Sequence, residues 1–191
     1  MKCGHFVPGF LPTIAPTGFY RKTGVGTPMH TPGHYGAALC LYAPIGFVVA
    51  IVHTIELAVV GAVVAAVLSP LPDIDLKLPF VAHRGVTHTI HFVVLVGLSM
   101  GVTGGVVATR TDTIEPLALA GFGLLIGVVS IGSHLLADAL TPMGIDPFRT
   151  GTRYTLSLTR AANPIANLVL LMLGVIAIVA AGWGLHLFGA L

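Results

Sequence analysis

Polar and charged side chains are gathered into a few short segments of this chain, and long uncharged runs separate these segments. Five such runs cover residues 35–52, 57–72, 89–109, 116–137 and 161–191. An α-helix needs about 20 apolar residues to cross the hydrocarbon core of a bilayer. The pattern therefore predicts an all-α integral membrane protein, built as a bundle of about five transmembrane helices.

The second run is short for a span, and neither Gly nor Pro separates it cleanly from the first. Its helix could be tilted, partly re-entrant or fused to the first helix. Composition supports the membrane class, because 55% of the 191 residues are hydrophobic and only 8% are charged. Soluble domains carry about 25% charged residues.

The first 28 residues are rich in Gly, Pro and Thr, without a basic segment that leads into an apolar stretch. We expect a flexible tail over 1–28 and no signal peptide, followed by a single transmembrane domain over 29–191. Met29 offers an internal start. The two cysteines, Cys3 and Cys40, are too few for a cysteine zinc site or a disulfide framework.

If each run crosses the membrane once, the polar segments alternate between two sides. One side carries eight basic residues and the other only Arg110; the eight are Lys2, Arg21, Lys22, Lys77, Arg84, Arg149, Arg153 and Arg160. By the positive-inside rule the basic side is cytoplasmic, which predicts a multi-pass cytoplasmic (inner) membrane protein with a cytoplasmic N-terminus. A positive net charge can indicate nucleic-acid binding, but here the basic residues of the cytoplasmic segments account for the net charge of +2. We therefore expect no nucleic-acid partner.

The same side gathers seven side chains that can bind a metal: His34, Asp73, Asp75, His83, His88, His134 and Asp138. In SHLLADALTP the His and the Asp are four residues apart, on one face of a helix. In LPDIDL two carboxylates follow two prolines, and in HRGVTH a glycine between two histidines permits a tight turn. Ionisable groups beside membrane segments tend to be functional, so we predict a metal-type site at the cytoplasmic face.

Other histidines fit this pattern less well. His53 and His186 lie on the opposite side, where we expect interfacial or packing roles. His91 could contact a metal-binding residue without binding the metal itself, or it could face a pore. His30 is a weak candidate for the metal site. The glycine spacings 97, 101, 105 and 123, 127 predict close helix packing.

Four ordered motifs, TPGHYG, LSPLPDID, HRGVTHT and GSHLLADALTPMGI, cover roughly residues 32–145. In these motifs the chain resembles the YdjM/YbcI-like membrane-bound, metal-dependent hydrolases, also described as LexA-binding inner-membrane-associated hydrolases. The resemblance implies that the seven metal candidates and Arg84 occupy motif positions. It implies no particular substrate.

Our first hypothesis is a metallohydrolase that acts on a phosphoester or a lipid-related substrate, with membrane lipid as its surroundings. Histidine content favours zinc, and the carboxylates make manganese the alternative. We assign Asp75 as a candidate general base, with an unligated His as the alternative, and Arg84 as the group that stabilises a substrate anion. Seven candidates exceed a four-coordinate site, so either two metals bind or some residues serve as acid or base. The alternatives are a metal or proton transporter and a non-catalytic, metal-stabilised membrane protein.

Overall fold

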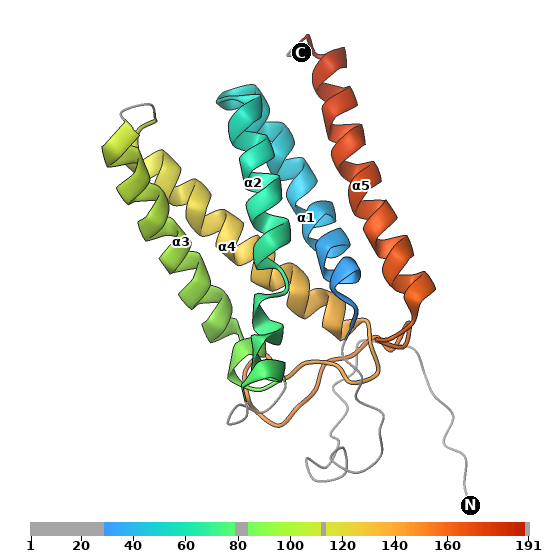
Figure 1. The fold of residues 1–191 in the computed structure, drawn as a ribbon. Coiled ribbons are helices and arrows are strands. Elements are labelled where there is room, and N and C mark those ends of the chain that lie inside the picture. Colours follow the sequence, from blue (N-terminus) through green and yellow to red (C-terminus); the bar gives the residue numbers. More distant parts are fainter. Residues whose placement is uncertain (1–28, 79–83, 112–113, 190–191) are drawn as a thin grey trace, which may run out of the picture.

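Five α-helices stand side by side and alternate in direction along the chain (Figure 1). The computed structural model describes residues 29–78, 84–111 and 114–189. The helices are α1 (Thr31–Val52), α2 (Ile55–Leu68), α3 (Ile90–Thr111), α4 (Pro116–Ala139) and α5 (Pro164–Leu187); two 3-10 helices are η1 (Leu71–Lys77) and η2 (Val86–His88). Strands are absent from this part of the chain, where Ile145 and Tyr154 form an isolated bridge. The predicted all-α membrane fold is confirmed, because five helical segments are long and apolar enough to cross a bilayer.

The first two apolar runs form two separate helices. Helix α1 ends at Val52, and the side chain of Thr54 accepts a hydrogen bond from the Leu57 amide to start α2. Fusion of the second run to the first is therefore excluded. The α-helical part of the second run has only 14 residues, but together with η1 it makes a span of 23 residues, Ile55–Lys77.

Two later helices start at a polar residue followed by proline. The Glu115 carboxylate accepts a hydrogen bond of 2.8 Å from the Ala118 amide at the start of α4. The side chain of Asn163 accepts from the amides of Ile165 and Ala166 at the start of α5. Such caps satisfy amides that lack a partner within the helix, and proline in the first turn brings no amide hydrogen. These hydrogen bonds determine the residues at which α4 and α5 begin.

Glycines bring α3 and α4 into close contact, as their spacing predicts. A Cβ atom on Gly127 would lie 2.8 Å from the Cα of Gly97, and one on Gly123 would collide with the carbonyl of Met100. A second close contact joins α1 to α5, where Gly36 faces the carbonyl of Leu170. At both contacts the absence of a side chain on glycine lets the helix backbones approach closely.

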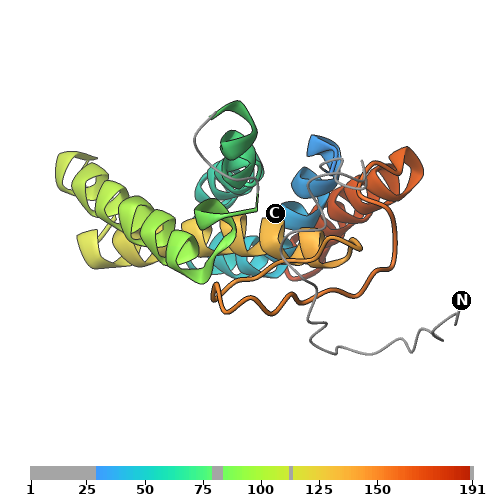
Figure 2. The same cartoon turned by 90° about the horizontal axis from the view of Figure 1, so that it is seen from below.

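The connection between α4 and α5 crosses the lower end of the bundle (Figures 1 and 2). The starts of α1 and α5, the end of α4, and both 3-10 helices lie at this end. The described basic residues of the segments at this end are Lys77, Arg84, Arg149, Arg153 and Arg160, whereas Arg110 lies in the last turn of α3 at the other end. The grouping of polar segments expected from the sequence is thus present in the fold.

Candidate metal centre

Four elements bring polar side chains together at the lower end of the bundle. The first turn of α1 supplies His34, η1 supplies Asp73 and Asp75, η2 ends in His88, and the last turns of α4 supply His134 and Asp138. Six of the seven metal candidates therefore converge. His83, the seventh, lies outside the residues that the structure describes.

Five distances of 3.1–3.7 Å join four side-chain atoms in this cluster. The Nε2 atom of His88 lies 3.1 Å from Nε2 of His134 and 3.3 Å from Oδ2 of Asp138. Oδ1 of Asp73 lies 3.5 Å from the His88 nitrogen and 3.6 Å from the His134 nitrogen. Oδ2 of Asp138 lies 3.7 Å from Nε2 of His134.

These five distances are close to the spacing of ligand atoms around one metal ion. Ligand atoms about 2.0–2.1 Å from a zinc ion lie about 3.3 Å from one another. All but the distance between the two histidine nitrogens exceed the roughly 3.2 Å upper limit of a good N–H···O hydrogen bond. His88, His134 and Asp138 are almost completely buried, and Oδ2 of Asp138 has no hydrogen-bond partner. The geometry and chemistry of this donor set fit a divalent cation.

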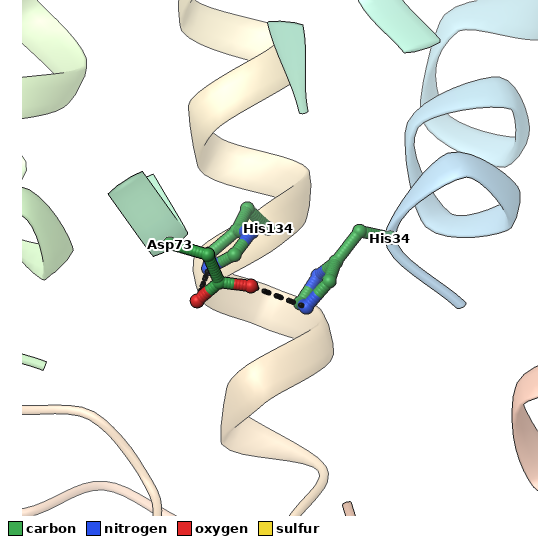
Figure 3. Close-up of side chains that lie close together, drawn as sticks. All are labelled: His34, Asp73 and His134. Carbon is green, nitrogen blue, oxygen red and sulfur yellow. Dashed lines mark ion pairs between the residues drawn. The ribbon is translucent and has the colours of Figure 1, made fainter. Parts of the chain in front are cut away.

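His34 adds a fifth side chain beside this set. Its ring stacks on that of His134, with centroids 3.8 Å apart, and its Nε2 lies 3.6 Å from Oδ2 of Asp73 (Figure 3). Both ring nitrogens of His34 are buried without a hydrogen-bond partner. Two groups of potential ligands thus share His134: one with His34 and Asp73, the other with His88 and Asp138.

Asp75 lies on the opposite side of the His88 ring from this convergence. Its Oδ2 accepts hydrogen bonds from the Arg84 amide (3.0 Å) and the Thr87 hydroxyl (2.9 Å), and lies 3.3 Å from Nδ1 of His88. The Thr87 hydroxyl oxygen is itself 3.0 Å from Nδ1. A proton on Nδ1 has acceptors here, which leaves the Nε2 lone pair directed at the cluster. Thr87 was missed by sequence reasoning, although its place beside His88 in the motif was a signal.

Arg84 is buried, with 7% of its surface exposed, rather than exposed to solvent. Its Nη2 donates a hydrogen bond of 2.6 Å to Oδ1 of Asp138. Its Nη1 donates to the Gly144 carbonyl (2.8 Å) and to the Thr141 hydroxyl (3.3 Å). One oxygen of Asp138 therefore pairs with Arg84 while the other faces the histidines. Thr141 and Gly144 were also missed, since nothing in their spacing links them to Arg84, which lies 57 and 60 residues earlier.

The carboxylates around His88 control its charge. Burial lowers the pKa of His88, but the nearby carboxylates of Asp138, Asp73 and Asp75, which favour its protonated ring, outweigh burial and raise this pKa to about 10. Without a metal the imidazole therefore holds a proton at neutral pH. A cation that binds at Nε2 must displace this proton.

Four other histidines in the described part of the chain lie outside the cluster. His53 terminates α1 at the opposite end of the bundle, and His186 lies near Trp183 in the last turn of α5. His91 is exposed on α3. His30 contacts the carbonyl of Ala162 at 3.3 Å and borders the site from the start of α1.

The chain matches a known protein family. The family model described as YdjM inner membrane protein matches residues 29–190, which include all five helices and the whole described cluster. No curated protein and no solved structure matches the chain.

Proposed function

Since this chain belongs to the YdjM inner membrane protein family, we propose that it is a membrane-bound, metal-dependent hydrolase that acts on a phosphoester or lipid-related substrate. The observation that carries the proposal is a set of donor atoms on His88, His134, Asp73 and Asp138, in which five pairs of atoms lie 3.1–3.7 Å apart. Two imidazoles and two carboxylates suit zinc, with manganese as the alternative. When bound, such an ion polarises the scissile bond and lowers the pKa of a coordinated water.

The surrounding residues hold this set in place. Asp75 and Thr87 orient the His88 ring through Nδ1. We assign Arg84 to the positioning of Asp138, because both of its terminal nitrogens donate within the protein. This role replaces direct contact with a substrate anion in our proposal.

His34 is the side chain best placed to accept a proton. Its ring nitrogens have no hydrogen-bond partner, and Nε2 lies 3.6 Å from Oδ2 of Asp73. Imidazole exchanges protons readily near neutral pH. We therefore propose His34 as the general base ahead of Asp75, whose Oδ2 already accepts two hydrogen bonds.

The transporter hypothesis receives less support from the described residues. Transport requires polar groups along a path from one side to the other, but the cluster lies at one end of the bundle. Toward the opposite end, a cavity of about 140 Å³ between α1, α2 and α5 is lined mainly by alanine and other apolar side chains, such as Phe47 and Ile55. We favour the hydrolase for this reason.

Charge supports a cytoplasmic position for the site. Five described basic residues belong to segments at the site end of the bundle, and one, Arg110, lies at the other end. Short cytoplasmic loops of membrane proteins carry such an excess. We propose that the cluster faces the cytoplasm.

The proposal is tested with the purified full chain in detergent, where no gradient exists. Metal content is measured by mass spectrometry, and turnover with p-nitrophenyl phosphate and a phospholipid. We expect His134→Ala and Asp73→Ala to lose bound metal and metal-dependent turnover, and His53→Ala, at the opposite end, to keep both. Unchanged metal content in both site variants would refute the metal centre. Full metal content with no turnover of either substrate would refute the hydrolase.

A further inference from the structure

A cavity of about 700 Å³ opens between the start of α1 and η1, beside the candidate metal centre. Asp73 is the cluster residue that lines it. The Asp73 side chain is 18% exposed, whereas the side chains of His34, His88 and His134 are completely buried. Among these residues, Asp73 therefore forms the contact between the cluster and the space outside it.

The walls of this cavity are of two kinds. Val67, Leu71 and Ile74 form an apolar wall on α2 and η1, and Val67 is 66% exposed at the bundle surface. Such exposed valines on a membrane span face the acyl chains of lipids. The polar wall, as we call the polar part of the lining, consists of Thr31 on α1 and Lys77 at the end of η1, one turn after Ile74. The cavity thus joins an apolar surface to a polar one at the membrane boundary.

The polar wall favours an anion. Lys77 is exposed, and it makes no ion pair with any residue in the described part of the chain. Three carboxylates and one guanidinium give the cluster a net charge of −2 when its imidazoles are neutral, and one divalent ion cancels that charge. Lys77 then adds a positive charge at the mouth of a neutral site. An ammonium group is a common partner for phosphate.

We propose that this cavity binds the head group of a phosphate-bearing lipid that enters sideways from the bilayer. The lipid phosphate pairs with Lys77, its ester bond lies next to Asp73, and its acyl chains lie along Val67 and the exposed apolar face of α2. The inference names the substrate of the proposed hydrolase and so rests on it. Hydrolysis joins a water oxygen to phosphorus and breaks the bond from phosphorus to the lipid oxygen, which takes up a proton.

An apolar wall distinguishes a lipid from a soluble phosphoester. A soluble substrate gains little from Val67, whose side chain borders the cavity at the outer surface of α2. A lipid keeps its acyl chains in the bilayer and brings only the head group to the polar wall. We therefore expect the cavity to bind an amphiphile rather than free phosphate.

The test uses zinc-loaded protein in detergent and a dioleoyl phosphonate, in which a methylene group replaces the ester oxygen, so that binding is measured without turnover. Native mass spectrometry compares this lipid with dioleoylglycerol, which lacks the phosphorus group, and inorganic phosphate, which lacks the chains. We expect the phosphonate lipid to bind more tightly than either. Lys77→Gln should raise its Kd about two- to fivefold, as for the loss of an exposed ion pair.

Two tryptophan variants on α2 separate the cavity from the lipid-facing surface in general. Val67→Trp fills the cavity mouth and should raise the Kd on the order of tenfold. Val60→Trp is the matched control: it lies seven residues earlier on the same helical face, is 56% exposed, and should leave the Kd unchanged. Metal content should be normal in both variants.

The outcomes separate this inference from the proposed function. Equal binding by the Val67→Trp and Val60→Trp proteins, no effect of Lys77→Gln, or inorganic phosphate binding as tightly as the lipid would each overturn the assignment of the cavity. Turnover of p-nitrophenyl phosphate without any preference for the phosphonate lipid would overturn only this assignment and leave the hydrolase. Preferential lipid binding without turnover of either phosphatidic acid or p-nitrophenyl phosphate would refute the hydrolase and retain the lipid site.

Discussion

Replacement of Arg84 by glutamine tests whether this residue positions Asp138 or contacts substrate. In the native protein its guanidinium donates a hydrogen bond of 2.6 Å to Oδ1 of Asp138 and one of 2.8 Å to the Gly144 carbonyl. Glutamine is shorter and uncharged, so Asp138 becomes a buried carboxylate without its charged partner. Arg84 has a backbone φ of 58°, which is equally unfavourable for glutamine and for arginine. The difference in stability between the two proteins should therefore come from the side-chain contacts.

The size of the effect depends on whether a metal is bound. Removal of one partner from a buried ion pair costs about 3–5 kcal/mol, and we expect a loss of unfolding free energy in this range for metal-free Arg84→Gln protein. A bound cation stabilises the Asp138 charge, so the loss should shrink at saturating zinc. Because Oδ1 is no longer held, the carboxylate can rotate away from the histidines. Zinc affinity should then fall about 10- to 100-fold, as for other residues that orient ligands.

Two measurements check these values. Unfolding by titration with sodium dodecyl sulfate, followed by circular dichroism, gives the free energy with chelator or with zinc. Competition with a chromophoric chelator gives the zinc affinity. In metal-free protein, Asp138→Asn combined with Arg84→Gln should cost less than the two single changes added together, because contacting residues couple by about 0.5–3 kcal/mol. Unchanged unfolding and zinc affinity in Arg84→Gln, together with a higher KM, would show that Arg84 contacts substrate and would refute the positioning role.

Three further predictions concern packing, ligand orientation and protonation. Gly127→Leu should lower the unfolding free energy by about 1–3 kcal/mol in the same titration, because its side chain meets the α3 backbone. Thr87→Val should weaken zinc binding about tenfold in chelator competition, because Asp75 loses a hydrogen-bond donor. Zinc binding at neutral pH should release about one proton, measured by calorimetry in buffers of different ionisation enthalpy, because the pKa of His88 is raised from 6.5 to about 10.

Each of these predictions has a control or a contrary result. Gly121 has open space around its Cα, so Gly121→Leu should leave stability unchanged; an equal loss in both variants would refute the packing argument. Thr103 bonds only within its own helix, so Thr103→Val should bind zinc normally. The protonated His88 stabilises the metal-free fold fully below pH 6.5 and loses this effect as the pH rises through about 10. Zinc affinity that did not rise with pH over this interval would contradict the raised pKa.

The sequence predicted the helices and the convergence of the site for a single physical reason. Apolar runs long enough to span a bilayer leave few places for ionisable groups, and alternation of sides then determines which of these groups can meet. His34 at the start of α1 and His134 near the end of α4 are 100 residues apart, yet their rings stack. Topology alone placed them at the same end.

The sequence did not predict the roles of individual residues in the site. Whether Arg84 faces solvent or Asp138 depends on the path of the connection after α4, which brings the Gly144 carbonyl to the guanidinium. The apposition of Gly36 in α1 to α5 was likewise hidden, because α1 and α5 are not neighbours in sequence. Spacing predicts which residues share a face, but not which helices pack together.

Asp73 and Asp75 show how one short element can serve both sides of the candidate centre. They are two positions apart in η1, and in a 3-10 helix with three residues per turn such positions point about 120° apart. Asp73 accordingly reaches the cluster and the cavity, while the carboxylate of Asp75 lies beside Nδ1 of His88. Asp73 can therefore face both the metal ligands and the substrate, while Asp75 orients the His88 ring through Nδ1. Exchange of either for asparagine separates these functions: Asp75→Asn should weaken zinc binding through His88 alone, whereas Asp73→Asn should also alter binding of the phosphonate lipid at saturating zinc.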